Sequence, residues 1–155
     1  KINNERVGDI QVTSSKLKPI IASKKYYLNA TDEYPILFTI AALIKGKSSF
    51  TGISGLRNKE SDRIKEMQKI LRQIGIMSKF NKNKLVINGS DRKDYSKKII
   101  KVSNLGDHRI CMSSAIIALL TGANAVIKNF ETVGTSSPNF LKIIKSLGGK
   151  FEKKN

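Results

Sequence analysis

The sequence has no tryptophan, one cysteine, one histidine and three prolines among its 155 residues. The single cysteine, Cys111, excludes an internal disulfide and favours a reducing compartment, so we expect a cytoplasmic location. Cys111 and His108 together cannot supply the ligands of an ordinary zinc site, and we expect no metal. No apolar run approaches the ~20 residues of a membrane-spanning helix and no signal peptide precedes the first predicted strand, so no membrane partner is expected.

Acidic side chains are also scarce. The chain has 12 Asp and Glu against 29 Lys and Arg, a formal net charge of +17. Such a charge favours polyanions or small anionic ligands. The basic residues are spread along the chain and are not interleaved with aromatic side chains, as nucleic-acid-binding surfaces usually require. Small anions are therefore the favoured interpretation, and a basic nucleic-acid-binding module is the alternative from a different functional class.

The apolar pattern predicts an α+β (α/β) fold in which helices and short strands alternate. The segment 61–74 has one apolar stripe, whereas 32–45 and 110–120 are apolar on nearly every side and should be buried. The segment 89–97 reads as a polar loop. Strands are expected at 7–13, 17–22, 48–53, 76–80, 84–88, 98–102, 124–128 and 150–152, and helices at 32–45, 61–74, 110–120 and 136–147.

The predicted elements form a repeat. Gly46 and Gly122 lie 76 positions apart (122 − 46), and at that offset Ile36, Ile40 and Ala42 fall on Met112, Ile116 and Ala118. Each unit reads helix, strand, amphipathic helix, strand, which divides the chain at 1–90 and 91–155. Repeated units of this kind pack their apolar helices against one another between sheets.

Charged residues begin both buried helices: Asp32 and Glu33 in one unit, and Asp107, His108 and Arg109 in the other. Charges at the ends of buried helices are costly unless they reach water or a ligand. We therefore predict a shared cleft at these helix ends.

The segment 56–64 (LRNKESDRI) places three basic and two acidic side chains directly before the amphipathic helix. The free backbone N–H groups and the dipole of a helix start favour anions there. From the charges alone, a solvated helix start is the alternative.

Three motifs together carry a resemblance to a known family. Asp32-Glu33-Tyr34-Pro35, the run 56–64 and Asp107-His108-Arg109-Ile110 resemble the C-terminal lobe of the 3-phosphoshikimate 1-carboxyvinyltransferase (EPSP synthase) family, and the run departs from LRVKESDR only at Asn58. The resemblance covers nearly the whole chain and implies βαβαββ units, three per lobe. The chain then looks like about two units of one lobe, without the N-terminal lobe. The Asp-Glu-Tyr-Pro form is similar to the glyphosate-tolerant bacterial class.

The resemblance implies an enzyme that transfers the enolpyruvyl group of phosphoenolpyruvate to the 5-hydroxyl of shikimate 3-phosphate and releases phosphate. No metal or organic cofactor is implied, and glyphosate is the implied inhibitor. A fragment that lacks half of the cleft is expected to fold without turnover. The related transferase that acts on UDP-N-acetylglucosamine is the alternative within the fold.

By the same resemblance, Asp32 contacts the 5-hydroxyl as candidate base and Glu60 is the candidate acid. Lys59 lies near both substrates, where it would stabilise charge on the leaving phosphate. Each residue also has a purely structural alternative. Asp32 would then only cap its helix, and Glu60 would only pair with Arg63 across one turn.

Arg63 and Arg109 match the phosphoenolpyruvate-binding arginines of the family, and planar guanidinium groups suit both carboxylate and phosphate. His108 matches the histidine beside that second arginine, either in contact with substrate or orienting the helix start. As a structural alternative, Arg109 would be only a surface charge.

Overall fold

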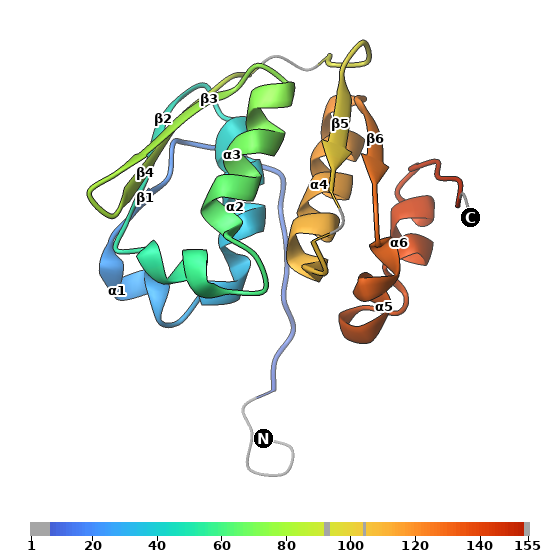
Figure 1. The fold of residues 1–155 in the computed structure, drawn as a ribbon, viewed down its shortest axis with the longest axis horizontal. Helices are drawn as coiled ribbons and strands as arrows, with labels where there is room; N and C mark the ends of the chain where they lie inside the picture. The colour runs from blue at the N-terminus through green and yellow to red at the C-terminus, as the bar shows by residue number, and fades with distance from the viewer. Residues whose placement is uncertain (1–6, 92–93, 104, 154–155) are drawn as a thin grey trace.

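The computed structural model describes residues 7–91, 94–103 and 105–153, in which helices and strands alternate along the chain (Figure 1). The strands are β1 (Ile21–Ala22), β2 (Gly46–Thr51), β3 (Met77–Asn81), β4 (Lys84–Gly89), β5 (Ile99–Val102) and β6 (Asn124–Ile127). The α-helices are α1 (Lys24–Tyr27), α2 (Tyr34–Ala42), α3 (Arg63–Gln73), α4 (His108–Thr121), α5 (Val133–Ser136) and α6 (Phe140–Ser146), with 3-10 helices η1 (Thr31–Glu33), η2 (Ser54–Asn58) and η3 (Phe130–Thr132). The α+β class expected from the sequence is confirmed.

The first sheet has the order β1-β2-β4-β3 and is covered on one face by α2 and α3 (Figure 1). β1 runs parallel to β2, and β2 pairs antiparallel with β4. The strands predicted at 76–80 and 84–88 pair as the hairpin of β3 and β4, which turns at Lys82 and Asn83, both with positive φ (44° and 59°), as tight hairpin turns require. This turn sets the register that directs Leu85 and Ile87 of β4 into the core.

The second sheet repeats the beginning of the first. β5 runs parallel to β6 with α4 between them in the chain, as β1 runs parallel to β2 with α2 between them. At the predicted offset of 76, the residues Ser48–Thr51 of β2 fall on Asn124–Ile127 of β6 (124 − 48 = 76). When the short helices α1 and α5 are left out, residues 21–89 have the element order β-α-β-α-β-β. Residues 99–146 repeat the first four elements of that order, β-α-β-α.

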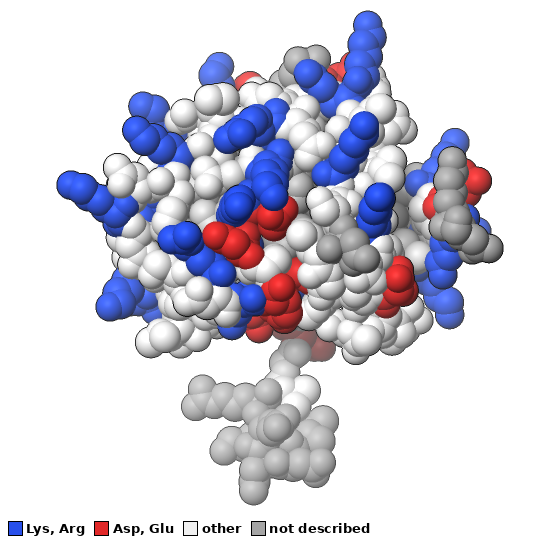
Figure 2. Space-filling model, in the orientation of Figure 1, with Lys and Arg blue, Asp and Glu red and all other residues white. Residues whose placement is uncertain are grey.

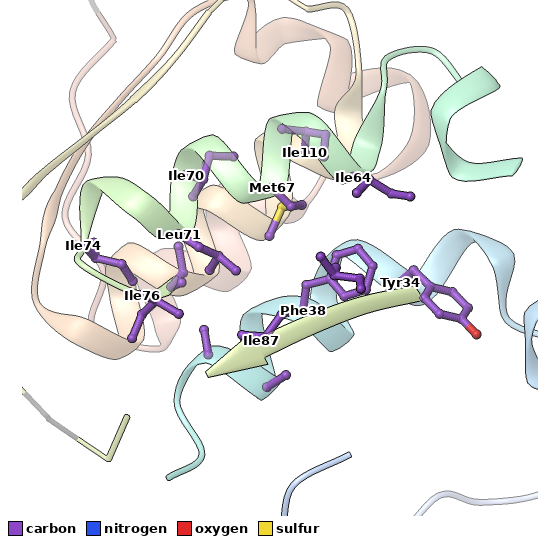
Figure 3. Close-up of a cluster of buried hydrophobic side chains, with 14 of the residues drawn as sticks. Tyr34, Phe38, Ile64, Met67, Ile70, Leu71, Ile74, Ile76, Ile87 and Ile110 are labelled. Atoms are coloured by element: carbon purple, nitrogen blue, oxygen red, sulfur yellow. The ribbon is translucent and has the colours of Figure 1, made fainter. Parts of the chain in front are cut away.

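Helix α3 lies between the two sheets and joins them. Its predicted apolar stripe is fully confirmed, since Ile64, Met67, Ile70, Leu71 and Ile74 are all buried, facing α2, α4 and β4 (Figure 3). On its other side, the Gln73 amide nitrogen donates to the Lys101 carbonyl (3.1 Å), and the Gln73 amide oxygen accepts from the Lys101 N–H (2.7 Å). The side chain thus bonds the edge of β5 as a neighbouring strand would.

Several predicted elements near the ends of the chain are wrong. Residues 7–13 form no strand and are exposed, and of 17–22 only Ile21–Ala22 is paired. Alternation of apolar and polar residues specifies a strand only where a partner edge is available. The predicted closing strand at 150–152 has no strand structure either, and a short helix, α1, occupies part of the polar stretch before Thr31.

Two of the predicted helices differ from expectation by three or more residues at one end. The helix expected over 136–147 begins only at Phe140, because Ser137 precedes Pro138 and adopts a non-helical conformation (φ −145°, ψ 76°). The helix expected over 32–45 begins as η1 and ends at Ala42, where the chain turns toward Gly46 (φ 122°). Of the loop predicted at 89–97, residues 92 and 93 lie outside the described part.

Within the described ranges, no helix combines the length and apolar character needed to cross a membrane. Over the same residues, no group of three or more His, Cys, Asp and Glu side chains is arranged to hold a metal ion.

Gly89, at the end of β4, lies directly against the end of α2, where a Cβ atom would overlap the carbonyl oxygens of Ala41 and Ile44. We expect Gly89→Ala to lower the free energy of unfolding by about 1–3 kcal/mol, because backbone atoms must shift to admit the methyl group. Urea denaturation measures the effect. Gly134→Ala is the matched control, since a Cβ there meets no atom within 4 Å. Equal stability of the two variants would contradict the close approach of β4 to α2.

Candidate active site

The helices α2, α3 and α4 begin at the same end of the molecule, which is the lower end in Figure 1. Asp32 lies in η1 just before α2, Lys59 and Glu60 precede α3, and Arg109 is in the first turn of α4. Figure 2 shows acidic and basic side chains together at this end of the surface. The charged helix starts for which the sequence predicts a shared cleft therefore lie together in the structure, and the cleft itself stays a prediction.

Arg63, the first residue of α3, is the centre of this group and its side chain is fully buried. Its Nε donates to Asp107 Oδ2 (3.0 Å), Nη1 to Asp32 Oδ1 (3.0 Å) and Nη2 to Glu60 Oε2 (2.7 Å). A longer bond joins Nη2 to Asp107 Oδ1 (3.4 Å). One guanidinium group thus ties together carboxylates from the starts of three helices.

Asp107 is the buried partner that the sequence did not reveal. Its side chain is fully buried and caps α4 by accepting from the backbone N–H groups of Arg109 and Ile110. Its Oδ2 also accepts from Ser61 Oγ (2.8 Å). Burial acts to raise the pKa of Asp107, but the hydrogen bonds from Arg63 and Ser61 outweigh it and the pKa is lowered. An aspartate directly before an apolar helix signals a cap, but the sequence shows no link to Arg63.

Asp32 has a half-exposed carboxylate surrounded by three cations. Beyond the bond from Arg63, its Oδ2 lies 3.4 Å from Arg109 Nη2 and its Oδ1 lies 3.7 Å from Lys59 Nζ. Partial burial acts to raise the pKa of Asp32, but the Arg63 hydrogen bond and the charges of Arg109 and Lys59 lower it overall. Asp32 is therefore ionised at neutral pH and has an oxygen that reaches solvent.

Lys59 and Arg109 are the partly exposed cations of the site, with side-chain exposures of 34% and 30%. Arg109 Nη1 donates to the Asp32 carbonyl oxygen (3.0 Å) and lies 3.8 Å from Glu33 Oε1. Glu60 is 46% exposed. An anion approaching from solvent thus meets Lys59 and Arg109 before it meets the buried Arg63.

His108 is the first residue of α4 and is partly buried. Among the hydrogen bonds and ion pairs of the described residues, none in this cluster involves its ring. A polar pocket of about 380 Å³ lies beside the cluster and is lined by Ser54, Gly55, Arg57, Asn58 and Asp62. Its lining contains none of the site residues predicted from the sequence, so the candidate chemistry belongs to the exposed charged cluster and not to this pocket.

Comparison with known proteins decides the family. The model of the family described as EPSP synthase (3-phosphoshikimate 1-carboxyvinyltransferase) matches residues 1–144. The chain belongs to the EPSP synthase family.

Curated relatives carry the name of this family. The 3-phosphoshikimate 1-carboxyvinyltransferase of Zymomonas mobilis is 35% identical over 154 residues, which cover 98% of the chain and 34% of that protein. The protein of the same name from Campylobacter jejuni subsp. doylei is 38% identical over 148 residues, covering 96% of the chain and 33% of the relative. The chain thus spans about a third of the length of these EPSP synthase relatives.

Solved structures agree with the family. An EPSP synthase from Acinetobacter baumannii superimposes with a TM-score of 0.75 at 29% identity, covering 90% of the chain and 32% of that structure. The enolpyruvyl transferase NikO from Streptomyces tendae superimposes with a TM-score of 0.61 at 13% identity and therefore shares the fold. The chain thus has the fold of this EPSP synthase, which NikO shares.

The lowered pKa values of Asp32 and Asp107 predict loss of stability in acid. Both carboxylates bind protons more weakly in the folded chain, so their contribution is fully present above the unfolded-state pKa of about 3.8 and is lost as pH falls through the folded-state values. Urea denaturation at about pH 6, 4 and 3 should show the free energy of unfolding falling below about pH 4. Asp107→Asn should flatten this dependence. An unchanged acid slope in that variant would contradict the role of Asp107.

Proposed function

We propose that the chain is part of a 3-phosphoshikimate 1-carboxyvinyltransferase, which transfers the enolpyruvyl group of phosphoenolpyruvate to the 5-hydroxyl of shikimate 3-phosphate and releases phosphate. The observation that carries the proposal is the joint position of Asp32 and Glu60, two half-exposed carboxylates held on one guanidinium group beside Lys59 and Arg109. Family membership supports it, because the named relatives are transferases of this kind.

The reaction is an addition followed by an elimination, and each stage needs a positioned proton carrier. In the addition, Asp32 takes the proton of the 5-hydroxyl while that oxygen bonds to the central carbon of phosphoenolpyruvate, and Glu60 gives a proton to the methylene carbon. In the elimination, the Glu60 carboxylate takes a proton back from the new methyl group, the carbon–oxygen bond to phosphate breaks with its electron pair leaving on phosphate, and the carbon–carbon double bond of the enol ether forms. Asp32 is suited to the first task because it is ionised and reaches solvent.

The cations of the cluster are proposed to bind the anionic groups of the substrate. Arg109 and Lys59 are partly exposed and are proposed to contact the carboxylate and phosphate groups of phosphoenolpyruvate, with Lys59 also near the leaving phosphate. Arg63, the other predicted phosphoenolpyruvate-binding arginine, is buried and is proposed to act on these groups through its positive charge. His108 is proposed to contact substrate or to orient the start of α4. The proposed reaction uses no metal or organic cofactor.

A complete transferase needs more than this chain, which spans a third of its relatives. We propose that residues 1–90 and 91–155 are two units of one lobe and that the other lobe supplies the rest of the cleft. The second unit supports this, because it exposes apolar side chains that a larger protein would cover. They include Leu120 (56%), Val126 (55%), Ile143 (50%) and Leu147 (62%).

Two narrower parts of the proposal concern inhibition and location. Glyphosate is proposed to inhibit the complete enzyme by competing at the cations of the phosphoenolpyruvate site. The free, buried thiol of Cys111 agrees with the reducing cytoplasm as its location.

The proposal is tested by joining the chain to the remaining two thirds of the Zymomonas mobilis relative and measuring phosphate release with both substrates. We expect release that requires phosphoenolpyruvate and shikimate 3-phosphate together, and none from the 155-residue chain alone, because half of the cleft is absent. The control replaces shikimate 3-phosphate with UDP-N-acetylglucosamine. A folded hybrid that releases no phosphate, or one that prefers the sugar nucleotide, would refute the proposal.

A further inference from the structure

Asp107 is a fully buried carboxylate that makes contacts in two directions. Toward its own helix it accepts from the N–H groups of Arg109 and Ile110, and toward α3 it accepts from Ser61 and Arg63. We propose that Asp107 is a positioning residue, which orients Arg63 and through it sets the places of Asp32 and Glu60. This inference rests on the proposed function, because those two carboxylates are its candidate proton carriers.

The guanidinium group of Arg63 leaves little freedom to its partners. It has five N–H donors in a rigid plane, and four donor bonds to three carboxylates use most of them. The two oxygens of Asp107 accept from Nε and Nη2. Nη1 donates to Asp32, and Nη2 also donates to Glu60. The angle at which Asp107 holds this plane therefore decides where the other two carboxylates lie.

Asp107 is itself fixed, whereas its indirect partners are not. Its backbone begins the buried helix α4, and its oxygens are held by the first-turn N–H groups and by Ser61 (2.8 Å). Asp32 and Glu60 are 45% and 46% exposed, so water competes for both. The remaining cations near Asp32 are farther away, with Arg109 at 3.4 Å and Lys59 at 3.7 Å. The buried helix α4 thus fixes Asp107, Asp107 orients Arg63, and Arg63 holds the two exposed carboxylates.

The alternative is that Asp107 only caps its helix, and the chain offers a matched residue to separate the two roles. Asp62 caps α3 by accepting from the Lys65 N–H (3.0 Å), and it pairs with the exposed Arg57 (3.2 Å) but has no bond to Arg63. Asparagine caps a helix about as well as aspartate. Asp107→Asn and Asp62→Asn therefore preserve both caps, while only the first removes the charge that faces Arg63.

The test uses the 155-residue chain labelled with ¹⁵N and ¹³C. Asp107→Asn is expected to shift the Arg63 Nε–H signal, to speed its hydrogen exchange by about tenfold or more, and to move the carboxyl signals of Asp32 and Glu60. Asp62→Asn is expected to leave all of these signals in place. Equal effects of the two variants, or unchanged Asp32 and Glu60 signals in Asp107→Asn, would overturn the proposal. If Asp107→Asn does not fold, Ser61→Ala is used instead, because it removes one hydrogen bond to Asp107. We then expect the same signals to shift by smaller amounts. Unchanged signals in Ser61→Ala would overturn the proposal.

A second readout separates this inference from the proposed function. In the hybrid enzyme, Asp107→Asn is expected to lower kcat by about tenfold or more with a smaller change in KM, whereas Asp62→Asn changes kcat by less than about twofold. An inactive hybrid together with the expected NMR shifts would refute the function and keep the positioning role. An active hybrid in which Asp107→Asn keeps full kcat would refute the positioning role alone.

Discussion

Glu60→Gln is expected to lower kcat of the complete hybrid enzyme by about 10²- to 10⁴-fold, the usual loss when a positioned general acid is removed. Glutamine has nearly the same shape and can still accept from Arg63 Nη2, but it has no acidic proton to give to the methylene carbon. KM should change much less than kcat, because the contact that is lost belongs to the transition state. Steady-state phosphate release with both substrates measures the effect.

Glu66→Gln is the matched control for this experiment. Glu66 lies in the first turn of α3, six residues after Glu60, and pairs with Lys69 (2.7 Å) away from the cluster. We expect its kcat to stay within about twofold of the parent. A Glu60→Gln enzyme as active as the Glu66→Gln enzyme would remove Glu60 from the chemistry and leave it as a surface partner of Arg63.

Arg63→Met is expected to lower the free energy of unfolding of the isolated chain by about 3–5 kcal/mol. Methionine fills much of the same volume, but Asp107, which is fully buried, then loses its cation. A buried carboxylate without a partner must either pay the cost of desolvation or take up a proton. Urea denaturation at neutral pH measures the loss.

Two further variants separate this charge effect from simple loss of packing. Arg57→Met removes an exposed arginine that is paired with Asp62, and it should cost less than about 1 kcal/mol. The double variant Arg63→Met, Asp107→Asn should be more stable than Arg63→Met alone, because no uncompensated charge is left buried and the cap on α4 is kept. A double variant no more stable than the single one would show that packing, and not the Asp107 charge, is responsible.

The predictions from the sequence succeeded where one local pattern had one physical solution. The stripe Ile64, Met67, Ile70, Leu71 and Ile74 can be buried on one face only in a helix. The polar run Asn81-Lys82-Asn83 between two short strand-like runs favours a tight turn, and the structure has the β3–β4 hairpin there. They failed at 7–13 and 150–152, because a strand also needs a partner edge that the local sequence does not encode.

The sequence by itself determined the family motifs, the repeat and the charged starts of the buried helices. It thereby singled out Asp32, Lys59, Glu60, Arg63, His108 and Arg109, whose proposed roles stay predictions. Only the tertiary structure decided how they are arranged: Arg63 is buried, Lys59 and Arg109 are partly exposed, and Asp107 is the anchor of the cluster. The reason is physical. Helix formation depends on neighbours within a few residues, whereas the contact of Arg63 with Asp107 joins residues 44 apart and exists only once α3 and α4 are packed together.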